Sequence, residues 1–186
     1  STASTTPSGS RSPTAAATVV DVTCNTGNDG SISVTSAGGT GAIQYSIDNG
    51  ASYQPGNVFS GLVAGNYQIT IQDANGCTAI ANATVAEPTA LVVNPTSVTS
   101  TCTNSNGSIT ITAGGGTGSI QYSIDNGTSY QPGNVFNGLV NGNYSVMVQD
   151  ANGCTAASSI NVIDEPSPII SSTPVVDVTC NAGNDG

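Results

Sequence analysis

Basic residues are almost absent from this chain of 186 residues, which has no Lys, no His and a single Arg, Arg11. Eleven acidic residues give it a formal net charge of -10. Proteins that bind a nucleic-acid backbone use clustered Lys and Arg, so we expect no nucleic-acid partner. His and Lys, the usual general bases, are missing too, and Ser or Cys would lack an activating partner. We therefore expect no enzyme activity.

Long hydrophobic runs and paired cysteines are also missing. No apolar stretch reaches the 18 residues typical of a transmembrane helix, so we expect no membrane span. The chain has five cysteines, and none stands in a CxxC pair of the kind that binds zinc. Long, regular cysteine spacing favours disulfides and an oxidising, extracellular compartment instead.

An internal repeat organises the chain. Cys24, Cys102 and Cys180 are spaced 78 residues apart, and residues 30–77 match residues 107–154 at 36 of 48 positions. A longer period is also visible, because VVDVTCNAGNDG from Val175 matches VVDVTCNTGNDG from Val19 at an offset of 156 residues. The unit is therefore predicted to be a pair of alternating modules.

The repeat predicts four segments. Residues 1–18 are rich in Ser, Thr and Pro and are expected to be a linker or stalk. Residues 19–88 form module 1 and residues 89–166 form module 2. Residues 167–186 are expected to be a linker and the start of a third module, so we interpret the chain as a window on a longer array or a subunit completed by its neighbour.

Apolar residues recur at period two within each module, which is typical of half-buried strands. Runs of this kind begin at Ile32, Ile43 and Tyr67. The turn segments GGTG, DNG, QPGN and ANG punctuate them, and two of these contain an Asn-Gly turn. Both residues of such a turn accept positive φ, so it is a strong hairpin signal. Short strands with a turn every 8 to 12 residues predict an all-β fold of tandem immunoglobulin-like β-sandwich modules with antiparallel strands. The run from Gly61 to Tyr67 resembles the corner at which a Tyr opens a late strand and bonds back to the backbone.

The cysteine pairing stays open at this stage. A small module buries a limited core, so a disulfide within each module would add stability. We favour the pairs Cys24–Cys77 and Cys102–Cys154. The alternative pairs, Cys77–Cys102 and Cys154–Cys180, would connect successive modules, and either scheme leaves one cysteine over.

Four segments carry a family resemblance: CNTGNDGSISV, GGTGAIQYSIDNG, SGLVAGNYQITIQDANGC and the closing Glu-Pro. They resemble the SprB-type repeat of bacterial cell-surface adhesins, and the resemblance covers nearly all of residues 19 to 186. One departure is that the family often has Trp where this chain has Ile47 and Ile124. The resemblance implies a secreted, bacterial cell-surface adhesin or filament built of tandem repeats.

Candidate sites are few. Asn28 and Asp29 are the weak candidates for a structural calcium site, because hard cations take clustered oxygen ligands; no other cofactor is expected. Turn geometry alone explains most Asp, Asn and Gly in the chain. Four asparagines match the glycosylation pattern and are expected to be exposed: Asn82, Asn106, Asn126 and Asn143. Met147 replaces Thr70 on the outward face of its strand, so it is a candidate contact with a neighbouring module or chain.

The function predicted from these observations is a structural and adhesive extracellular fibre or surface filament. Its expected partners are neighbouring modules or identical chains, with a surface or glycan ligand that the sequence does not identify. The alternative is an array of carbohydrate-binding modules in a secreted protein. That alternative predicts an exposed aromatic platform, for which Tyr53 and Tyr130 are the candidates.

Overall fold

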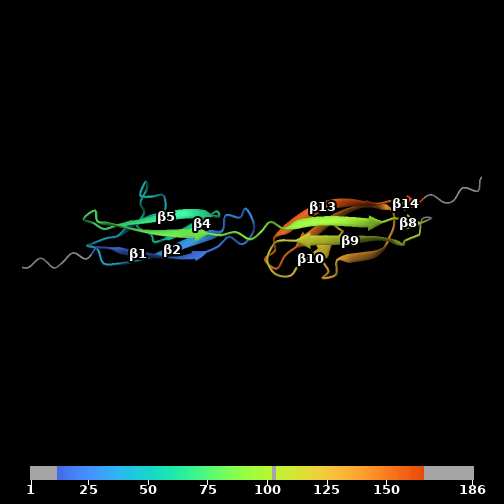
Figure 1. The fold of residues 1–186 in the computed structure, drawn as a ribbon, viewed down its shortest axis with the longest axis horizontal. Coiled ribbons are helices and arrows are strands. Elements are labelled where there is room, and N and C mark those ends of the chain that lie inside the picture. The colour runs from blue at the N-terminus through green and yellow to red at the C-terminus, as the bar shows by residue number, and fades with distance from the viewer. Residues whose placement is uncertain (1–11, 102–103, 166–186) are drawn as a thin grey trace, which may run out of the picture.

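The computed structural model describes residues 12–101 and 104–165, and places them in two β-sandwiches that lie end to end (Figure 1). Module 1 contains β1 (Thr14–Val20), β2 (Gly30–Ala37), β3 (Gln44–Ser46), β4 (Val58–Leu62), β5 (Gly65–Gln72) and β6 (Thr78–Val85). Module 2 contains β7 (Val92–Val98), β8 (Ser100–Thr101), β9 (Gly107–Gly114), β10 (Gln121–Ser123), β11 (Val135–Leu139), β12 (Gly142–Gln149), β13 (Thr155–Val162) and β14 (Asp164–Glu165). The described residues include no helix that could cross a membrane. The predicted all-β fold is confirmed.

Each module contains two three-stranded antiparallel sheets, and in module 2 the short strands β8 and β14 also pair with each other in parallel. In module 1 the strand orders are β1-β2-β4 and β3-β5-β6, and in module 2 they are β7-β9-β11 and β10-β12-β13. In module 1 the first, second and fourth strands therefore share one sheet, and the third, fifth and sixth share the other. Module 2 has the same division once β8 and β14 are set aside. This division, with both sheets antiparallel, is that of an immunoglobulin-like sandwich.

The core of each module lies between the facing strands of its two sheets. In module 1, Ile32 and Val34 of β2 pack in one cluster with Ile69 and Ile71 of β5, and all four side chains are fully buried. Module 2 repeats the cluster with Ile109, Ile111, Val146 and Val148. Burying one such side chain contributes about 1.5–3 kcal/mol. The predicted alternation is thus confirmed in β2, β9 and β12, whereas in β5 Thr70 is buried as well as Ile69 and Ile71.

The first strand begins earlier than the sequence predicted. β1 starts at Thr14 and pairs with β2 from Thr14↔Ala37 onward, so residues 14–18 belong to module 1 and not to the predicted linker. Ala15 and Ala17 contact the core while their neighbours are exposed. Alanine buries little area, so this alternation gives only a weak hydrophobic signal.

The predicted tyrosine corner is present in both modules. The Tyr67 hydroxyl, at the start of β5, donates a hydrogen bond of 3.0 Å to the carbonyl oxygen of Val63. Tyr144 donates an equal bond of 3.0 Å to the carbonyl oxygen of Val140. Each bond fixes the turn that leads into the central strand of the second sheet.

The Asn-Gly turns fold a loop back over the outer face of that sheet. Asn49 and Gly50 have φ of 62° and 82°, as the turn requires. The loop then returns so that Gln54 pairs with Tyr45. Thr70, on the outer face of β5, is therefore buried within its own module, and its hydroxyl has no hydrogen-bond partner.

Met147 occupies the same position in module 2. It is half-buried, and a β-carbon on Gly127 would lie 2.8 Å from its Sδ atom. The side chain therefore packs beneath the Asn-Gly turn of its own module. This packing accounts for the methionine, and the predicted contact of Met147 with a neighbour stays a prediction.

Strand direction separates the two cysteines of module 1. β5 pairs with β6 from Gly65↔Val85 at one end to Gln72↔Thr78 at the other. The cysteine loop, which we define as residues 23–29, lies at the Val85 end, because Val22 just before it donates its N–H to the carbonyl oxygen of Ala86 at 3.1 Å. Cys77 lies at the opposite end, in the turn between β5 and β6. The eight residues of β5 span roughly 25 Å, so these two regions are far apart.

Candidate functional site

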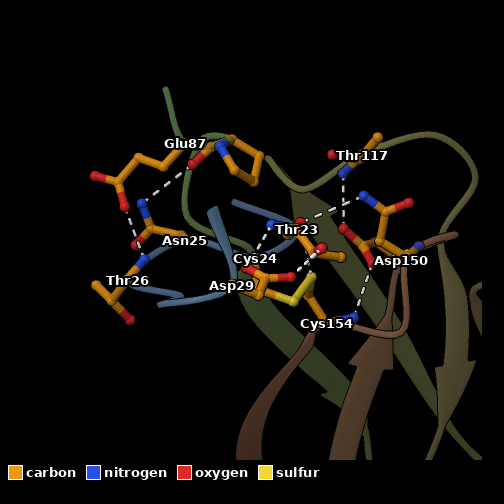
Figure 2. The surroundings of a disulfide bond; sticks show 11 residues. Thr23, Cys24, Asn25, Thr26, Asp29, Glu87, Thr117, Asp150 and Cys154 are labelled. Carbon is orange, nitrogen blue, oxygen red and sulfur yellow. Dashed lines mark hydrogen bonds between the residues drawn. A yellow bond between two sulfur atoms is a disulfide. The ribbon is translucent and has the colours of Figure 1, made fainter. Parts of the chain in front are cut away.

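A disulfide connects the two modules. Cys24, in the cysteine loop of module 1, is bonded to Cys154 of module 2, with the Cα atoms 5.7 Å apart and 130 residues between them in sequence. Cα separations of this size are usual for disulfides. Figure 2 shows the bond at the junction, with the strands of module 2 leading away from it.

The pairing corrects the sequence prediction. Because Cys24 bonds Cys154, the favoured pairs Cys24–Cys77 and Cys102–Cys154 are wrong, and so is the alternative pair Cys154–Cys180. Cys77 is a free, exposed thiol, so Cys77–Cys102 is not formed either. The physical reason is that Cys24 and Cys77 lie at opposite ends of one sandwich. Residues 102 and 180 themselves lie outside the described residues.

The cysteine loop is held by Asp29. One carboxylate oxygen accepts the backbone N–H of Thr23 at 2.9 Å, and the other accepts the Thr23 hydroxyl. The hydroxyl bond, followed by the backbone bond, holds the pKa of Asp29 below its usual range. Asp29 thus fixes the residue that precedes Cys24.

This role bears on the predicted cation site. Both oxygens of Asp29 already accept hydrogen bonds from Thr23, and within the described residues no group of three or more His, Cys, Asp or Glu could hold a metal ion. Asn28 is exposed beside it. A calcium ion on Asn28 and Asp29 stays a prediction, and the loop geometry does not require one.

Cys154 is presented by a tight turn, residues 150–154, which we call the cysteine turn of module 2. Oδ1 of Asp150 accepts the N–H groups of Asn152 at 3.0 Å and Cys154 at 2.9 Å. Oδ2 accepts the N–H of Thr117 at 2.7 Å. The side chain is only 5% exposed. One buried carboxylate therefore orients both residues that reach across the junction.

Polar contacts reinforce the disulfide. The Asn152 side-chain amide donates to the carbonyl oxygen of Thr23 at 3.3 Å, and Sγ of Cys154 lies 3.5 Å from the same oxygen. The oxidised sulfur has no proton to donate, so this second approach is a contact only. Thr23, held by Asp29, is thus the point on module 1 that the cysteine turn meets (Figure 2).

The segment between the modules is fixed at both ends. The Glu87 carboxylate accepts the N–H of Thr26 at 2.7 Å, and the Asn25 amide donates to the Pro88 carbonyl oxygen at 3.1 Å. Further along, the carbonyl oxygen of Thr89 accepts the N–H of Gly116 in module 2 at 2.9 Å. The Glu-Pro connection is therefore tied to both sandwiches and does not behave as a free linker.

An open hollow of about 440 Å³ lies at this junction, between the disulfide, the connection and Asp150. Most of the residues that line it are small, and none of them is aromatic. It has the character of a gap between two joined bodies more than that of a ligand pocket.

The predicted glycosylation sites are spread over the surface. All four asparagines are exposed, as predicted: Asn82, Asn106, Asn126 and Asn143. Asn106 has a structural use as well, because its side chain bonds both the N–H and the hydroxyl of Thr101 at 2.8 and 2.7 Å. Their modification stays a prediction.

Aromatic side chains form no exposed platform. All eight lie in the described residues and are half-buried, including Tyr53 and Tyr130, the two residues proposed for a carbohydrate surface. The hydroxyl of each lies close beneath its own turn glycine, Gly50 or Gly127. Nothing in this arrangement favours the alternative of a carbohydrate-binding array.

Comparison with known proteins is consistent with this architecture. The sequence profile of the SprB repeat matches residues 16–52 and 94–129, the first part of each module. We found no match among curated protein sequences.

Among solved structures, the three N-terminal domains of the bacteriophage RB49 outer capsid protein Hoc have 16% identity and a TM-score of 0.48, with 82% of this chain and 59% of that one covered. The fibronectin(III)-like modules of Clostridium thermocellum CbhA have 18% identity and a TM-score of 0.37, covering 83% and 98%. A Dscam isoform structure has 12% identity and a TM-score of 0.36, covering 86% and 47%. The chain thus spans less than two thirds of the capsid and Dscam structures.

The duplicated segments, the two sandwiches and the two profile matches agree. The SprB repeat profile thus matches once in each immunoglobulin-like module, as the resemblance of the sequence motifs predicted.

Proposed function

We propose that the chain is part of an extracellular, surface-exposed fibre that has a structural and adhesive role and no catalytic one. The observation that carries the proposal is the Cys24–Cys154 disulfide, which locks two successive repeats end to end. Structural disulfides persist in oxidising compartments outside the cytosol. A covalent lock between repeats serves an array that must hold its shape.

Two further features fit a stiff, exposed fibre. The connection between the modules is hydrogen-bonded to both of them, through Glu87 and Thr89, so bending at the junction would break these bonds as well as strain the disulfide. The net charge of -10 keeps chains soluble by mutual repulsion. With Arg11 as its only basic residue, the chain offers trypsin-like proteases a single cleavage site.

Stiffness is tested by NMR relaxation on the whole chain. We expect the backbone amides of both modules to tumble as one elongated body when the disulfide is intact. A variant with Cys24→Ser and Cys154→Ser should show two bodies with shorter and more nearly independent correlation times. Independent tumbling in the oxidised chain would contradict the proposed stiffness.

Location and form are tested by electron microscopy of intact source cells labelled with an antibody against the chain. We expect label along filaments outside the cell, with an axial spacing that fits two modules. Label confined to the cell interior would contradict the proposal.

A further inference from the structure

Cys77 is the counterpart in module 1 of the bonded Cys154. Both residues close the same Asp-Ala-Asn-Gly-Cys sequence, which lies between β5 and β6 in module 1 and between β12 and β13 in module 2. Cys154 is in a disulfide with Cys24, whereas Cys77 is a free and exposed thiol. The turn in module 2 therefore shows the kind of partner, a loop cysteine of another module, that the matching turn in module 1 can bind.

The two turns have the same geometry although only one has a partner. Oδ1 of Asp73 accepts the N–H groups of Asn75 and Cys77, each at 2.9 Å, and Oδ2 accepts that of Thr40 at 2.9 Å. The matching bonds of Asp150 are 2.7–3.0 Å long. Each aspartate is 5% exposed. Cys77 is thus held in the orientation in which Cys154 forms its bond.

The surface that meets such a turn is also repeated. In module 1, Thr23 is held by Asp29, and its carbonyl oxygen receives the Asn152 amide. In module 2 the equivalent Thr101 is held by Asn106 through two hydrogen bonds of 2.7 and 2.8 Å. Cys102 follows Thr101 in sequence, as Cys24 follows Thr23. The chain therefore repeats both halves of the junction.

We propose that Cys77 accepts a second inter-repeat disulfide, formed with the loop cysteine of another SprB repeat placed against the Cys77 end of module 1. This proposal rests on the proposed array. The first cysteine of each repeat bonds the second cysteine of the repeat that follows it, so an array would carry one covalent cross-link at every junction. The other repeat belongs either to the same polypeptide or to a second copy of the chain.

The reaction is a thiol–disulfide exchange with a low-molecular-weight disulfide such as oxidised glutathione. One cysteine thiolate attacks the disulfide and forms a mixed disulfide while one glutathione thiol leaves. The thiolate of the other cysteine then attacks the protein sulfur and releases the second glutathione. Two protein thiols are oxidised, and one glutathione disulfide is reduced to two thiols.

The test uses the chain extended in register by a second copy of residues 31–186, so that Gly186 takes the place of Gly30. This extended chain has nine cysteines. In either outcome Cys24 bonds the first Cys154 and Cys180 bonds the second Cys154. The proposal adds a third disulfide between Cys102 and the Cys77 of the second copy, which leaves three thiols free. If the second Cys77 has no such partner, five stay free.

Thiol titration after unfolding, together with peptide mapping without reduction, distinguishes these outcomes. We expect three thiols and a peptide that joins Cys102 to the second Cys77. Changing Cys77→Ser in the second copy only should raise the count to four. A free second Cys77 in molecules that contain Cys24–Cys154 would overturn the proposal, because that bond shows that the junction has folded and the conditions oxidise it. This result would leave the surface location of the fibre untouched.

A second arm addresses the source of the partner. The unextended chain is incubated at high concentration in a glutathione redox buffer. Covalent oligomers that join Cys77 to Cys102 or Cys180 of another copy would show that separate chains can supply the loop cysteine, and would support the proposal. Dimers joined only through Cys77–Cys77 would show an ordinary exposed thiol and would count against it.

Discussion

Module 1 and module 2 have nearly the same sequence and fold, but the turns that carry their second cysteines, Cys77 and Cys154, have different surroundings. We call both turns cysteine turns. Residues 30–77 and 107–154 share 36 of 48 positions, and their cores and tyrosine corners coincide. Yet Cys154 is bonded and half-buried, whereas Cys77 is free and exposed. The difference comes from the neighbour, since the turn itself is the same. A disulfide in this protein is therefore a property of the junction between repeats.

The largest effect of this difference should appear under tension. In the oxidised chain, force applied between the termini passes directly from Cys24 to Cys154, so the intervening segment cannot extend. The two cysteines are 130 residues apart, so reduction should release about 450 Å of contour length at roughly 3.5 Å per residue. Single-molecule stretching of the oxidised and reduced chain measures this directly.

The control for this experiment is Cys77→Ser. It removes the free thiol of module 1 and should leave the extension of the oxidised chain unchanged. Equal extension of the oxidised and reduced chains would mean that the disulfide does not shield the modules.

Much of the fold was predictable because it depends on local pattern. The alternation around Ile32 and Tyr67 predicted the central strands, and the Asn-Gly pairs at 49–50 and 126–127 predicted turns in which both residues do have positive φ. The early start of β1 was missed because Ala15 and Ala17 bury little surface. These successes and this failure all follow from the strength of the local hydrophobic signal.

The cysteine pairing required three-dimensional information. The limited core of a small module favoured Cys24–Cys77, but strand direction puts those residues at opposite ends of a sandwich. When modules lie end to end, one module's loop cysteine faces the next module's cysteine turn. Following strand direction through the predicted immunoglobulin-like topology would have excluded the pair within a module. The contact of Asn152 across the junction and the bond that ties Glu87 to the cysteine loop have no comparable sequence signal.

The next comparison is between Thr70 and Met147, which occupy the same position beneath the Asn-Gly turn. The Thr70 hydroxyl is buried without a hydrogen-bond partner, an arrangement that costs about 1–3 kcal/mol. Thr70→Val keeps the shape and removes the hydroxyl, so it should stabilise module 1 by about 1 kcal/mol. Native-state hydrogen exchange of the β5 amides measures this change.

The reverse substitution provides the matched test. Met147→Thr places the same unpartnered hydroxyl in module 2 and removes buried apolar surface, so the β12 amides should lose about 1–2 kcal/mol of protection. If instead Met147→Thr left the protection of β12 unchanged, the difference between the modules at this position would be surface drift without energetic consequence.

A smaller effect is expected when Asn152 and Asn75 are each changed to Ala, because only the first change should weaken the Cys24–Cys154 disulfide. Asn152→Ala removes the 3.3 Å bond to the Thr23 carbonyl oxygen, and a net hydrogen-bond contribution of about 0.5–1 kcal/mol lowers the equilibrium constant for the Cys24–Cys154 disulfide two- to fivefold. Mass spectrometry after equilibration in glutathione buffers gives that constant. Asn75→Ala changes the same residue in the unpartnered turn and should leave it unchanged. An equal loss in both variants would assign the effect to turn stability and not to the junction.

The smallest difference between the modules is expected at Asp48 and Asp125. Both carboxylates should stay ionised to unusually low pH. The Asp125 carboxylate accepts hydrogen bonds from the hydroxyls of Ser123 and Ser129, which lower its pKa to about 2; Ser46 and Ser52 lower the pKa of Asp48 in the same way. A folded-state pKa below the unfolded value of about 3.9 means that these bonds contribute their full stability above pH 4 and lose it as the pH falls toward 2.

Acid should therefore loosen the two Asn-Gly loops together, and carboxyl-carbon NMR shifts followed from pH 5 to pH 1.5 measure both aspartates in one sample. Ser46→Ala should raise the pKa of Asp48 and leave that of Asp125 in place, because each loop acts within its own module. A shift of Asp125 in that variant would contradict this independence and would show that the two modules are electrostatically coupled.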